Sequence, residues 1–317
     1  MVQHYPVLLA ESLELLNIRP AGTYLDCTAG MGGHTGAIAA RLSEAGTVIA
    51  NDRDPQSLEM ARANTAQYWD RIEFQHASFS ELSLSELKRS RLDGMLADLG
   101  VSRFHLTDPE RGFSFMSDGP LDMRLDQTRG MTAADLVNHS AEKQLADWLY
   151  QLGEERRARK ITGALIRGRP VRSTRHLADI VERAVPRTGP IHPATRTFMA
   201  LRMVVNQEME ELDALLASAP QMVRPGGHIV IISFHSLEDR KVKNSFRELA
   251  RTGKAVLLTK KPIVPGDSEV RDNPPSRSAK LRAIAMASDV ADEQPSSNSV
   301  GDRDADNDSA DSADSEE

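Results

Sequence analysis

Apolar and polar residues along residues 20–100 fall into short runs that predict strands and helices in turn. Strands are expected at residues 24–27, 47–50, 72–76 and 92–98, and the second leads into Asp52. Helical composition follows at residues 35–42, and Asp54-Pro55 is a good N-cap and first position for a helix to about residue 66. A Ser/Leu/Glu-rich helix is expected before the fourth strand. This alternation predicts βαβ units and a parallel sheet.

The next convincing strand comes late, at residues 228–233, after a predicted turn at residues 224–227. Roughly 125 residues separate it from the fourth strand, about three times what a crossover needs. Most of the excess has helical character, over residues 141–152, 158–166, 176–185 and 196–216. In the last of these, an apolar stripe repeats at helical spacing: Phe198, Leu201, Val205, Leu212 and Leu215. We therefore expect an inserted helical domain.

Composition narrows the class of protein. The chain has 317 residues, 40% hydrophobic and 27% charged, which fits one large or two ordinary globular domains. It contains no apolar run of about 18 residues and begins without a secretion signal, so we expect a soluble, cytoplasmic protein with no membrane association. A single cysteine, Cys27, and nine scattered histidines give no metal-ligand spacing.

The formal net charge of −7 is unevenly distributed. Residues 289–317 hold eleven acidic residues and one arginine, which leaves 38 basic and 35 acidic residues, or +3, in residues 1–288. Because this tail has no aromatic and almost no large aliphatic residues, we expect it to be disordered. The body of the protein is therefore compatible with a nucleic-acid partner.

The strongest local motif lies between the first strand and the first helix, where Gly30, Gly32 and Gly33 follow Asp26. Glycines at such a turn let the backbone approach a ligand closely. Asp52 lies 19 residues beyond Gly33, where an acidic residue normally accepts hydrogen bonds from ribose hydroxyls. The pattern favours a small polar cofactor over a plain tight turn.

A dinucleotide fingerprint needs a small residue at its third glycine position, which is Thr35 here, so a dehydrogenase is disfavoured. S-adenosylmethionine (AdoMet) has a ribose but no pyrophosphate and tolerates the looser turn. Asp98, at the end of the fourth strand, is then a candidate for contact with the cofactor amino group or a substrate amine.

The sequence resembles the ribosomal RNA small subunit methyltransferase H family, over roughly residues 4–285. The motifs that carry the resemblance are Gly32-Gly33-His34, Asp52-Arg53-Asp54-Pro55, Asp98-Leu99-Gly100-Val101-Ser102, Arg111-Gly112-Phe113-Ser114-Phe115, Asp118-Gly119-Pro120-Leu121-Asp122-Met123-Arg124, Gly153-Glu154-Glu155-Arg156, His192-Pro193-Ala194-Thr195-Arg196-Thr197-Phe198, Ser233-Phe234-His235-Ser236-Leu237-Glu238-Asp239-Arg240 and Ser276-Arg277-Ser278-Ala279-Lys280-Leu281-Arg282.

The resemblance implies an α/β fold, a Rossmann-like AdoMet methyltransferase sheet with an inserted all-helical domain, here followed by the disordered acidic C-terminal tail. The expected boundaries are residues 1–106 and 218–288 for the two parts of the methyltransferase domain, 107–217 for the helical, RNA-recognition domain and 289–317 for the tail. It also implies an AdoMet-dependent enzyme that methylates the exocyclic N4 of a cytidine in the decoding region of 16S rRNA, within the small ribosomal subunit. It gives no oligomeric state.

The cofactor pocket implied by the resemblance falls on Gly32, Gly33, His34, Asp52, Phe79 and Asp98. One position departs from the family pattern. Where the family usually reads Val-Ser-Ser-x-Gln-Leu-Asp, residues 101–107 of this chain place His105 at the cofactor-contacting glutamine. An imidazole can donate or accept one hydrogen bond there, but not both as the amide can.

Methylation of cytosine N4 needs an acceptor for the amino hydrogens, because the nitrogen lone pair is delocalised into the ring. The candidates are Asp98, Ser102, Asp122 and His235. Asp122 alternatively braces the loop at Arg124, and Ser236 with Asp239 alternatively reads as a helix N-cap pair. Methylation of C5 would instead need a cysteine nucleophile, and Cys27 is poorly placed for that role.

A basic stretch without acidic residues spans residues 156–175 and is expected to bind RNA phosphates. Its residues are Arg156, Arg157, Arg159, Lys160, Arg167, Arg169, Arg172 and Arg175. Phe113 and Phe115 are candidates either for stacking on a flipped base or for core anchors. Two other functions stay open, a methyltransferase of another substrate on the same fold and a non-catalytic rRNA-binding assembly factor.

Overall fold

The computed structural model describes residues 6–87, 89, 91–187 and 189–288. The chain as far as Ala287 forms one compact unit. The predicted acidic tail, residues 289–317, lies outside the described residues. Within the described part of the chain, no helix is both long enough and apolar enough to cross a membrane.

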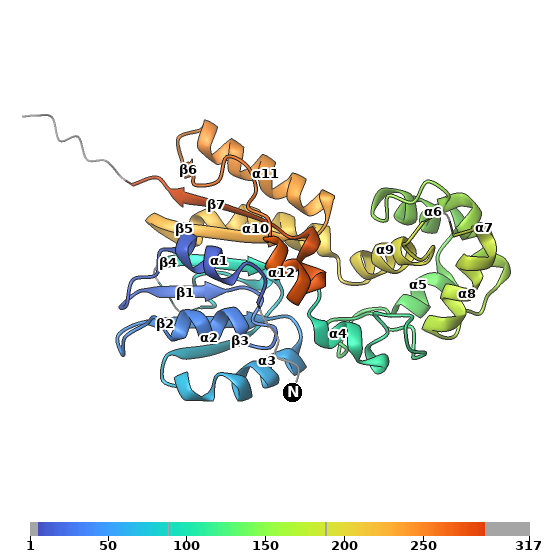
Figure 1. Cartoon of the computed structure of the whole chain (residues 1–317), viewed down its shortest axis with the longest axis horizontal. Coiled ribbons are helices and arrows are strands. Elements are labelled where there is room, and N and C mark those ends of the chain that lie inside the picture. Colours follow the sequence, from blue (N-terminus) through green and yellow to red (C-terminus); the bar gives the residue numbers. More distant parts are fainter. Residues whose placement is uncertain (1–5, 88, 90, 188, 289–317) are drawn as a thin grey trace, which may run out of the picture. The chain divides into compact units, whose positions relative to one another are not determined.

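A seven-stranded sheet carries the fold, in the order β3-β2-β1-β4-β5-β7-β6 (Figure 1). The strands are β1 (Thr23–Asp26), β2 (Thr47–Asp52), β3 (Ile72–His76), β4 (Leu92–Asp98), β5 (Val223–Ser233), β6 (Ala255–Leu257) and β7 (Lys280–Met286). The first five are parallel neighbours, and β7 is antiparallel to both β5 and β6. The Rossmann-like α/β prediction is confirmed, and the sheet ends in two strands that the sequence analysis did not predict.

Helices connect and cover these strands. The α-helices are α1 (Leu9–Leu16), α2 (Gly33–Ala39), α3 (Pro55–Asn64), α4 (Arg103–Thr107), α5 (Ala133–His139), α6 (Glu142–Gln151), α7 (Ala158–Arg167), α8 (Thr174–Ala184), α9 (Thr195–Val205), α10 (Glu208–Met222), α11 (Ser236–Arg251) and α12 (Asp267–Asp272). The described residues also form short 3-10 helices: η1 (Ala66–Tyr68), η2 (Phe79–Glu81), η3 (Pro109–Arg111) and η4 (Pro274–Ser278).

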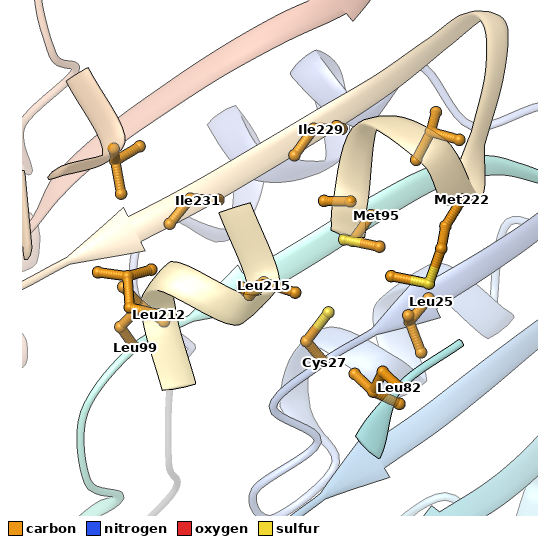
Figure 2. Packing of buried hydrophobic residues seen from close by; sticks show 14 of the residues in the cluster. Leu25, Cys27, Leu82, Met95, Leu99, Leu212, Leu215, Met222, Ile229 and Ile231 are labelled. Atoms are coloured by element: carbon orange, nitrogen blue, oxygen red, sulfur yellow. The ribbon is translucent and has the colours of Figure 1, made fainter. Parts of the chain in front are cut away.

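Alternate residues of the strands supply two hydrophobic clusters, because successive side chains of a strand point to opposite faces. Met95, Ile229 and Ile231 pack on one face with Leu212 and Leu215 of α10 (Figure 2). On the other face, the buried strand residues pack with apolar residues of α1, α2 and α3. Both faces of the sheet are therefore covered, as the continuous apolar pattern of its central strands predicts.

A third cluster is formed by the helices between β4 and β5, with Leu145, Ile161, Leu177 and Leu201 in its interior. The helices that form it, α5 to α9, are amphipathic, and their apolar faces pack on one another rather than on the sheet. The long interval between the fourth and fifth strands is therefore occupied by helices with a core of their own.

The predicted single helix over residues 196–216 is wrong. The chain forms two helices, α9 and α10, separated at Asn206 and Gln207, where Gln207 adopts a left-handed conformation with φ of 51°. The apolar stripe consequently divides between two cores, with Leu201 in the helical cluster and Leu212 against the sheet. A periodic pattern continues across such a break, so it could not reveal the change of direction.

Two further local predictions need correction. Residues 224–227 do not form a separate turn before the strand. They belong to β5, where the pairing with β4 shifts in register opposite Asp93. The described residues between η2 and β4 hold no α-helix. The isolated segment there is short and gains little from propensity alone, because helices of this length depend on packing an apolar face.

Candidate active site

The glycine turn between β1 and α2 is held in shape by a buried carboxylate. Asp26 accepts hydrogen bonds from the Thr35 hydroxyl at 2.6 Å and from the Thr28 backbone N–H at 3.1 Å. Burial raises the pKa of Asp26 to about 6, although these hydrogen bonds oppose the shift. Gly30 has a φ of 51°, and a Cβ at this position would meet only a carbonyl oxygen 3.9 Å away. The turn therefore leaves space beside its backbone.

Gly32 and Gly33 act through close packing. A Cβ on Gly32, which has a φ of 88°, would lie 2.9 Å from the Thr65 side chain, and one on Gly33 would lie 2.5 Å from Pro6. Gly33 lines the cavity described below, and Gly32 does not. Gly32 thus shapes the turn from behind rather than forming part of the cavity wall.

Asp52, at the end of β2, is tied to the same turn. Its carboxylate accepts the Gly30 N–H and the Asp54 N–H, both at 2.8 Å. Burial raises its pKa, and the two backbone hydrogen bonds oppose this shift. Each carboxylate oxygen retains a second lone pair, so Asp52 can still accept hydrogen bonds from ligand hydroxyls.

Asp98 lies at the end of β4, with its carboxylate in the wall of the same site. Its Oδ1 atom is buried and has no hydrogen-bond partner among the described residues. Its Oδ2 atom lies 3.8 Å from Nδ1 of His34, whose Nε2 is 3.1 Å from the carbonyl oxygen of Val7. Burial, followed by the nearby carboxyls of Asp26 and Glu238, raises the pKa of Asp98 well above its ordinary value. Such a group favours a positively charged or proton-donating ligand.

The carboxyl ends of the strands open into a cavity that brings most of the predicted cofactor residues together. Gly33, His34, Asp52, Phe79, Asp98 and His105 all line it. Arg53, beside Asp52, is also in the wall, and residues distant in the sequence complete it, including Val7, Asn206, Glu208, Glu211, Phe234, Glu238 and Asp272. This location agrees with the general rule that open parallel sheets bind ligands beyond the carboxyl ends of their strands.

Among the charged side chains of the cavity wall, carboxylates outnumber basic groups. Asp52, Asp98, Glu208, Glu211, Glu238 and Asp272 face two arginines, Arg53 and Arg103. Burial also raises the pKa of Glu238, because desolvation penalises its charged form. A cationic ligand would relieve the repulsion among these groups, so the cavity suits a molecule that carries positive charge.

His105 lies in the wall with both ring nitrogens engaged by the protein. Its Nδ1 accepts the Ser102 N–H at 3.0 Å, and its Nε2 lies 2.8 Å from Asp54 Oδ2. Ser102 and His105 also form a reciprocal capping box for α4. The imidazole thereby anchors α4 to the N-terminal end of α3.

Two predicted proton acceptors lie outside this cavity wall. Both carboxylate oxygens of Asp122 accept hydrogen bonds from the Arg124 guanidinium at 2.8 Å. Asp122 therefore braces the loop at Arg124, which was the alternative to a role as proton acceptor. His235 is the N-cap of α11, where its side chain accepts the Leu237 N–H at 3.4 Å. Its capping partner is Glu238, so the predicted cap pair of Ser236 and Asp239 is displaced by one residue.

The two phenylalanines of the loop after η3 pack within the helical cluster. Phe113 is buried, and its ring centroid lies 5.3 Å from that of His105. Phe115 contacts the rings of His192 and Phe198, at centroid distances of 4.6 and 4.9 Å. Both rings therefore pack with the core of the helical cluster, and neither forms an open surface on which a flipped base could stack.

The basic stretch divides into exposed and tethered side chains. Arg156, Arg157, Arg159, Lys160 and Arg167 are exposed on and beside α7. Arg169 is half-buried and donates hydrogen bonds to the carbonyl oxygens of Val137 and Ser140, at 2.8 and 2.6 Å. Arg169 thus fixes the end of α5, while the other seven basic residues of the stretch, including Arg172 and Arg175, are exposed to solvent.

Sequence reasoning did not identify Arg53, Asn206 or Glu238 as parts of the site. Asn206 lies in the wall because the chain breaks between α9 and α10, which no local pattern indicated. One local signal could have indicated Glu238. It lies three residues after His235, and this is the spacing of the two residues of a capping box. The described residues contain no group of three or more His, Cys, Asp or Glu that could hold a metal ion.

Comparison with known proteins identifies the chain. The model of the MraW methylase family matches residues 1–287. The chain belongs to the MraW methylase family. One relative, the ribosomal RNA small subunit methyltransferase H of Solibacter usitatus, is 61% identical over 285 residues, covering 89% of this chain and 99% of that protein. The protein of the same name from Koribacter versatilis is 50% identical over 293 residues, covering 89% and 93%. The resemblance stated from the motifs is thus confirmed, and the protein is a methylase.

Proposed function

We propose that this MraW family methylase transfers the methyl group of AdoMet to the exocyclic N4 of a cytidine in the decoding region of 16S rRNA. The observation that carries the proposal is the match of residues 1–287 to a methylase family whose curated members include ribosomal RNA small subunit methyltransferase H. We further infer that the substrate is the RNA within the small ribosomal subunit and that the protein acts in the cytoplasm.

The residues of the cavity fit AdoMet. We infer that Asp52 binds the ribose hydroxyls, since its side chain lines the cavity, and that the ligand lies beside Gly30, where the turn leaves space. Gly33, His34 and Phe79 form part of the same wall, and Gly32 sets the shape of the turn. The acidic lining suits the sulfonium and ammonium charges of this cofactor. When bound, AdoMet supplies an electrophilic methyl group attached to a positively charged sulfur.

The proposed proton acceptor is Asp98. The lone pair of N4 attacks the methyl carbon while the bond from that carbon to sulfur breaks, and N4 then loses a proton. Asp98 Oδ1 is the buried acceptor in the cavity wall that lacks a partner among the described residues. Its raised pKa strengthens it as a base, since proton acceptors work best when their pKa lies near the working pH. We do not extend this role to Asp122 or His235, whose side chains are engaged elsewhere.

No covalent enzyme intermediate is needed for this reaction. Cys27 is buried within the hydrophobic cluster that also contains Leu25 and Leu82 (Figure 2). Burial raises the pKa of its thiol, so the reactive thiolate is disfavoured. A buried, protonated thiol supports attack by the substrate amine rather than ring activation by a cysteine nucleophile.

RNA recognition is proposed for the helical domain, residues 107–217, through the exposed residues Arg156, Arg157, Arg159, Lys160 and Arg167. Exposed guanidinium and ammonium groups on one helix and its N-terminal end can follow a phosphate backbone. Arg169 would support this surface indirectly, since its guanidinium is bound to the backbone of the preceding helices.

The proposal is tested by incubating the protein with methyl-labelled AdoMet and either small ribosomal subunits or free 16S rRNA. Nucleoside mass spectrometry should then reveal labelled N4-methylcytidine. Absence of this nucleoside with both substrates would overturn the proposal. Label in another nucleoside would indicate a different substrate on the same fold, and AdoMet binding without transfer would indicate a non-catalytic assembly factor.

A further inference from the structure

Arg53 lies where two cavities of the structure meet. It follows Asp52 at the carboxyl end of β2, and its half-buried side chain lines both the proposed cofactor cavity and a second, neighbouring cavity. Asn206 and Glu211 also line both cavities. These three residues therefore form a shared wall, and a ligand in the second cavity would approach the first across it.

The second cavity is lined by residues that follow β2 and β3 and by residues of the β4–β5 interval. Ser78, Ser80 and Glu81 come from the chain after β3, and Arg124, Asp126, Arg129, Gly130 and Met131 come from the loop before α5. Helix α6 adds Trp148 and Gln151. The cavity is thus bounded by both the sheet and the helical cluster, beside the point where methyl transfer is proposed.

Among the described residues, the guanidinium of Arg53 has an N–H donor that no protein acceptor uses. Its Nη1 donates a hydrogen bond to the carbonyl oxygen of Asn206. Its Nε is buried and has no acceptor among the described residues. A buried donor without an acceptor raises the free energy of the folded protein. A ligand that supplies an acceptor to this N–H would therefore bind favourably.

The charges around Arg53 indicate which kind of acceptor this is. Burial lowers the pKa of Arg53, while the nearby carboxylates of Glu211, Asp126 and Glu208 oppose the shift. Arg124 and Arg129 also line the second cavity, but their guanidinium groups are held by the carboxylates of Asp122, Glu81 and Asp126, whereas Glu210 and Glu211 add negative charge to its wall. A phosphate would be repelled by these carboxylates, whereas a neutral carbonyl or ring nitrogen would not.

We propose that Arg53 reads the target base itself, by donating hydrogen bonds to O2 and N3 of the cytosine whose N4 is turned towards the cofactor cavity. This inference rests on the proposed function. Cytosine carries both neutral acceptors on the same edge as its amino group, and a planar guanidinium matches two adjacent acceptors. Uracil presents a donor at N3, and adenine lacks the O2 acceptor. Arg53 thus acts as a specificity-determining residue, a role separate from attraction to the RNA backbone.

The test compares Arg53→Lys and Arg53→Gln with wild-type protein and with Arg62→Gln, an exposed control on α3 that contacts the Phe74 ring and lines neither cavity. Methylation of small subunits is measured over a range of subunit and salt concentrations. AdoMet affinity and thermal stability are measured in parallel. The wild-type assay tests the proposed function, and only the variants test the role of Arg53.

We expect both Arg53 variants to raise the KM for subunits about ten- to a hundredfold, with AdoMet affinity unchanged. Lysine should not restore recognition, because it cannot present two coplanar donors, and the dependence of binding on salt should stay that of wild type. If lysine restores the KM and glutamine lowers the log–log salt slope by about one, Arg53 contacts a phosphate and the inference is overturned.

Two other results would also overturn it. Unchanged KM values in both variants would show that Arg53 does not contact the substrate. A parallel loss of AdoMet affinity would show that it supports the cofactor cavity instead. If wild-type protein forms no N4-methylcytidine, the proposed function fails first, and the inference falls with it.

Discussion

The carboxylate of Asp54 lies 3.0 Å from the guanidinium of Arg111, and both side chains are only 2% exposed. Asp54 caps α3, accepting the Gln56 N–H and the Ser57 hydroxyl, while Arg111 also donates to the carbonyl oxygens of Arg124 and Leu125. This pair therefore connects the N-terminal end of α3 to the loop that leads into the helical cluster. Its burial makes it sensitive to the loss of either partner.

Replacing Arg111 by methionine should destabilise the protein by about 3–5 kcal/mol, because Asp54 would remain buried without its cationic partner. Urea-induced unfolding measures the change. Lys143→Ala is the matched control, since Lys143 and Asp147 form an exposed ion pair that contributes at most about 1 kcal/mol. Equal losses in the two variants would contradict the importance of burial.

The same carboxylate should make stability fall in acid. Burial alone would raise the pKa of Asp54, but hydrogen bonds from His105 and Arg111 hold it at about 2, below the ordinary 3.8. Its stabilising effect is thus complete above the ordinary value and is lost as the pH falls from about 4 towards 2. Asp54→Asn should flatten this part of the curve of unfolding free energy against pH. An identical pH dependence in wild type and variant would contradict the assignment.

Asp52→Ala should weaken AdoMet binding by about 1.5–3 kcal/mol, through the loss of charge-assisted hydrogen bonds to the ribose. Isothermal titration calorimetry measures the affinity, with the exposed Asp70→Asn as control. An affinity equal to that of wild type would exclude the proposed contact. Because Asp52 also accepts the Gly30 and Asp54 N–H groups, thermal unfolding of the variant should be recorded alongside.

Asp98→Asn should lower the rate of methyl transfer at least about a hundredfold while making the protein more stable at neutral pH. Burial raises the pKa of Asp98, so the folded state is penalised once the pH rises above the ordinary value of 3.8, where the unfolded chain ionises. Near pH 3 both states are protonated, and the gain in stability should vanish. Retention of activity would refute the role as proton acceptor, and a loss of stability at pH 7 would refute the electrostatic argument.

The exposed basic residues of α7 should control the salt dependence of RNA association. Replacing both Arg159 and Arg167 by glutamine should lower the log–log salt slope of binding to 16S rRNA by about two, if each contacts a phosphate. Arg41→Gln, an exposed position just after α2, is the single-charge control and should leave the slope unchanged. A slope unaffected by the double substitution would place the RNA elsewhere.

Several features followed from local sequence alone. The predicted strands at residues 72–76 and 92–98 have the bounds of β3 and β4, because short apolar runs between turns have few alternatives. The glycine turn, Asp52 and Asp98 were found because chemistry at the ends of parallel strands depends on neighbouring residues in the chain. The family also followed from the sequence, through motifs spread over most of its length.

Other features depended on contacts between distant residues. The break at Gln207, the antiparallel β7 and the presence of Asn206 in the cavity wall arise from packing that no local periodicity records. From the sequence, His105 was known only as the residue that replaces the family's glutamine. The structure shows that its two ring nitrogens are hydrogen-bonded to Ser102 and Asp54.

The sequence thus determined the positions of the first five strands, the glycine-rich turn and the carboxylates at the strand ends, since each depends on residues close together in the chain. The tertiary structure decided which carboxylates are buried, how Asp54 and Arg111 join α3 to the loop before the helical cluster, and where Arg53 lines two cavities. These properties come from desolvation and from contacts across more than fifty residues. They exist only once the chain has folded.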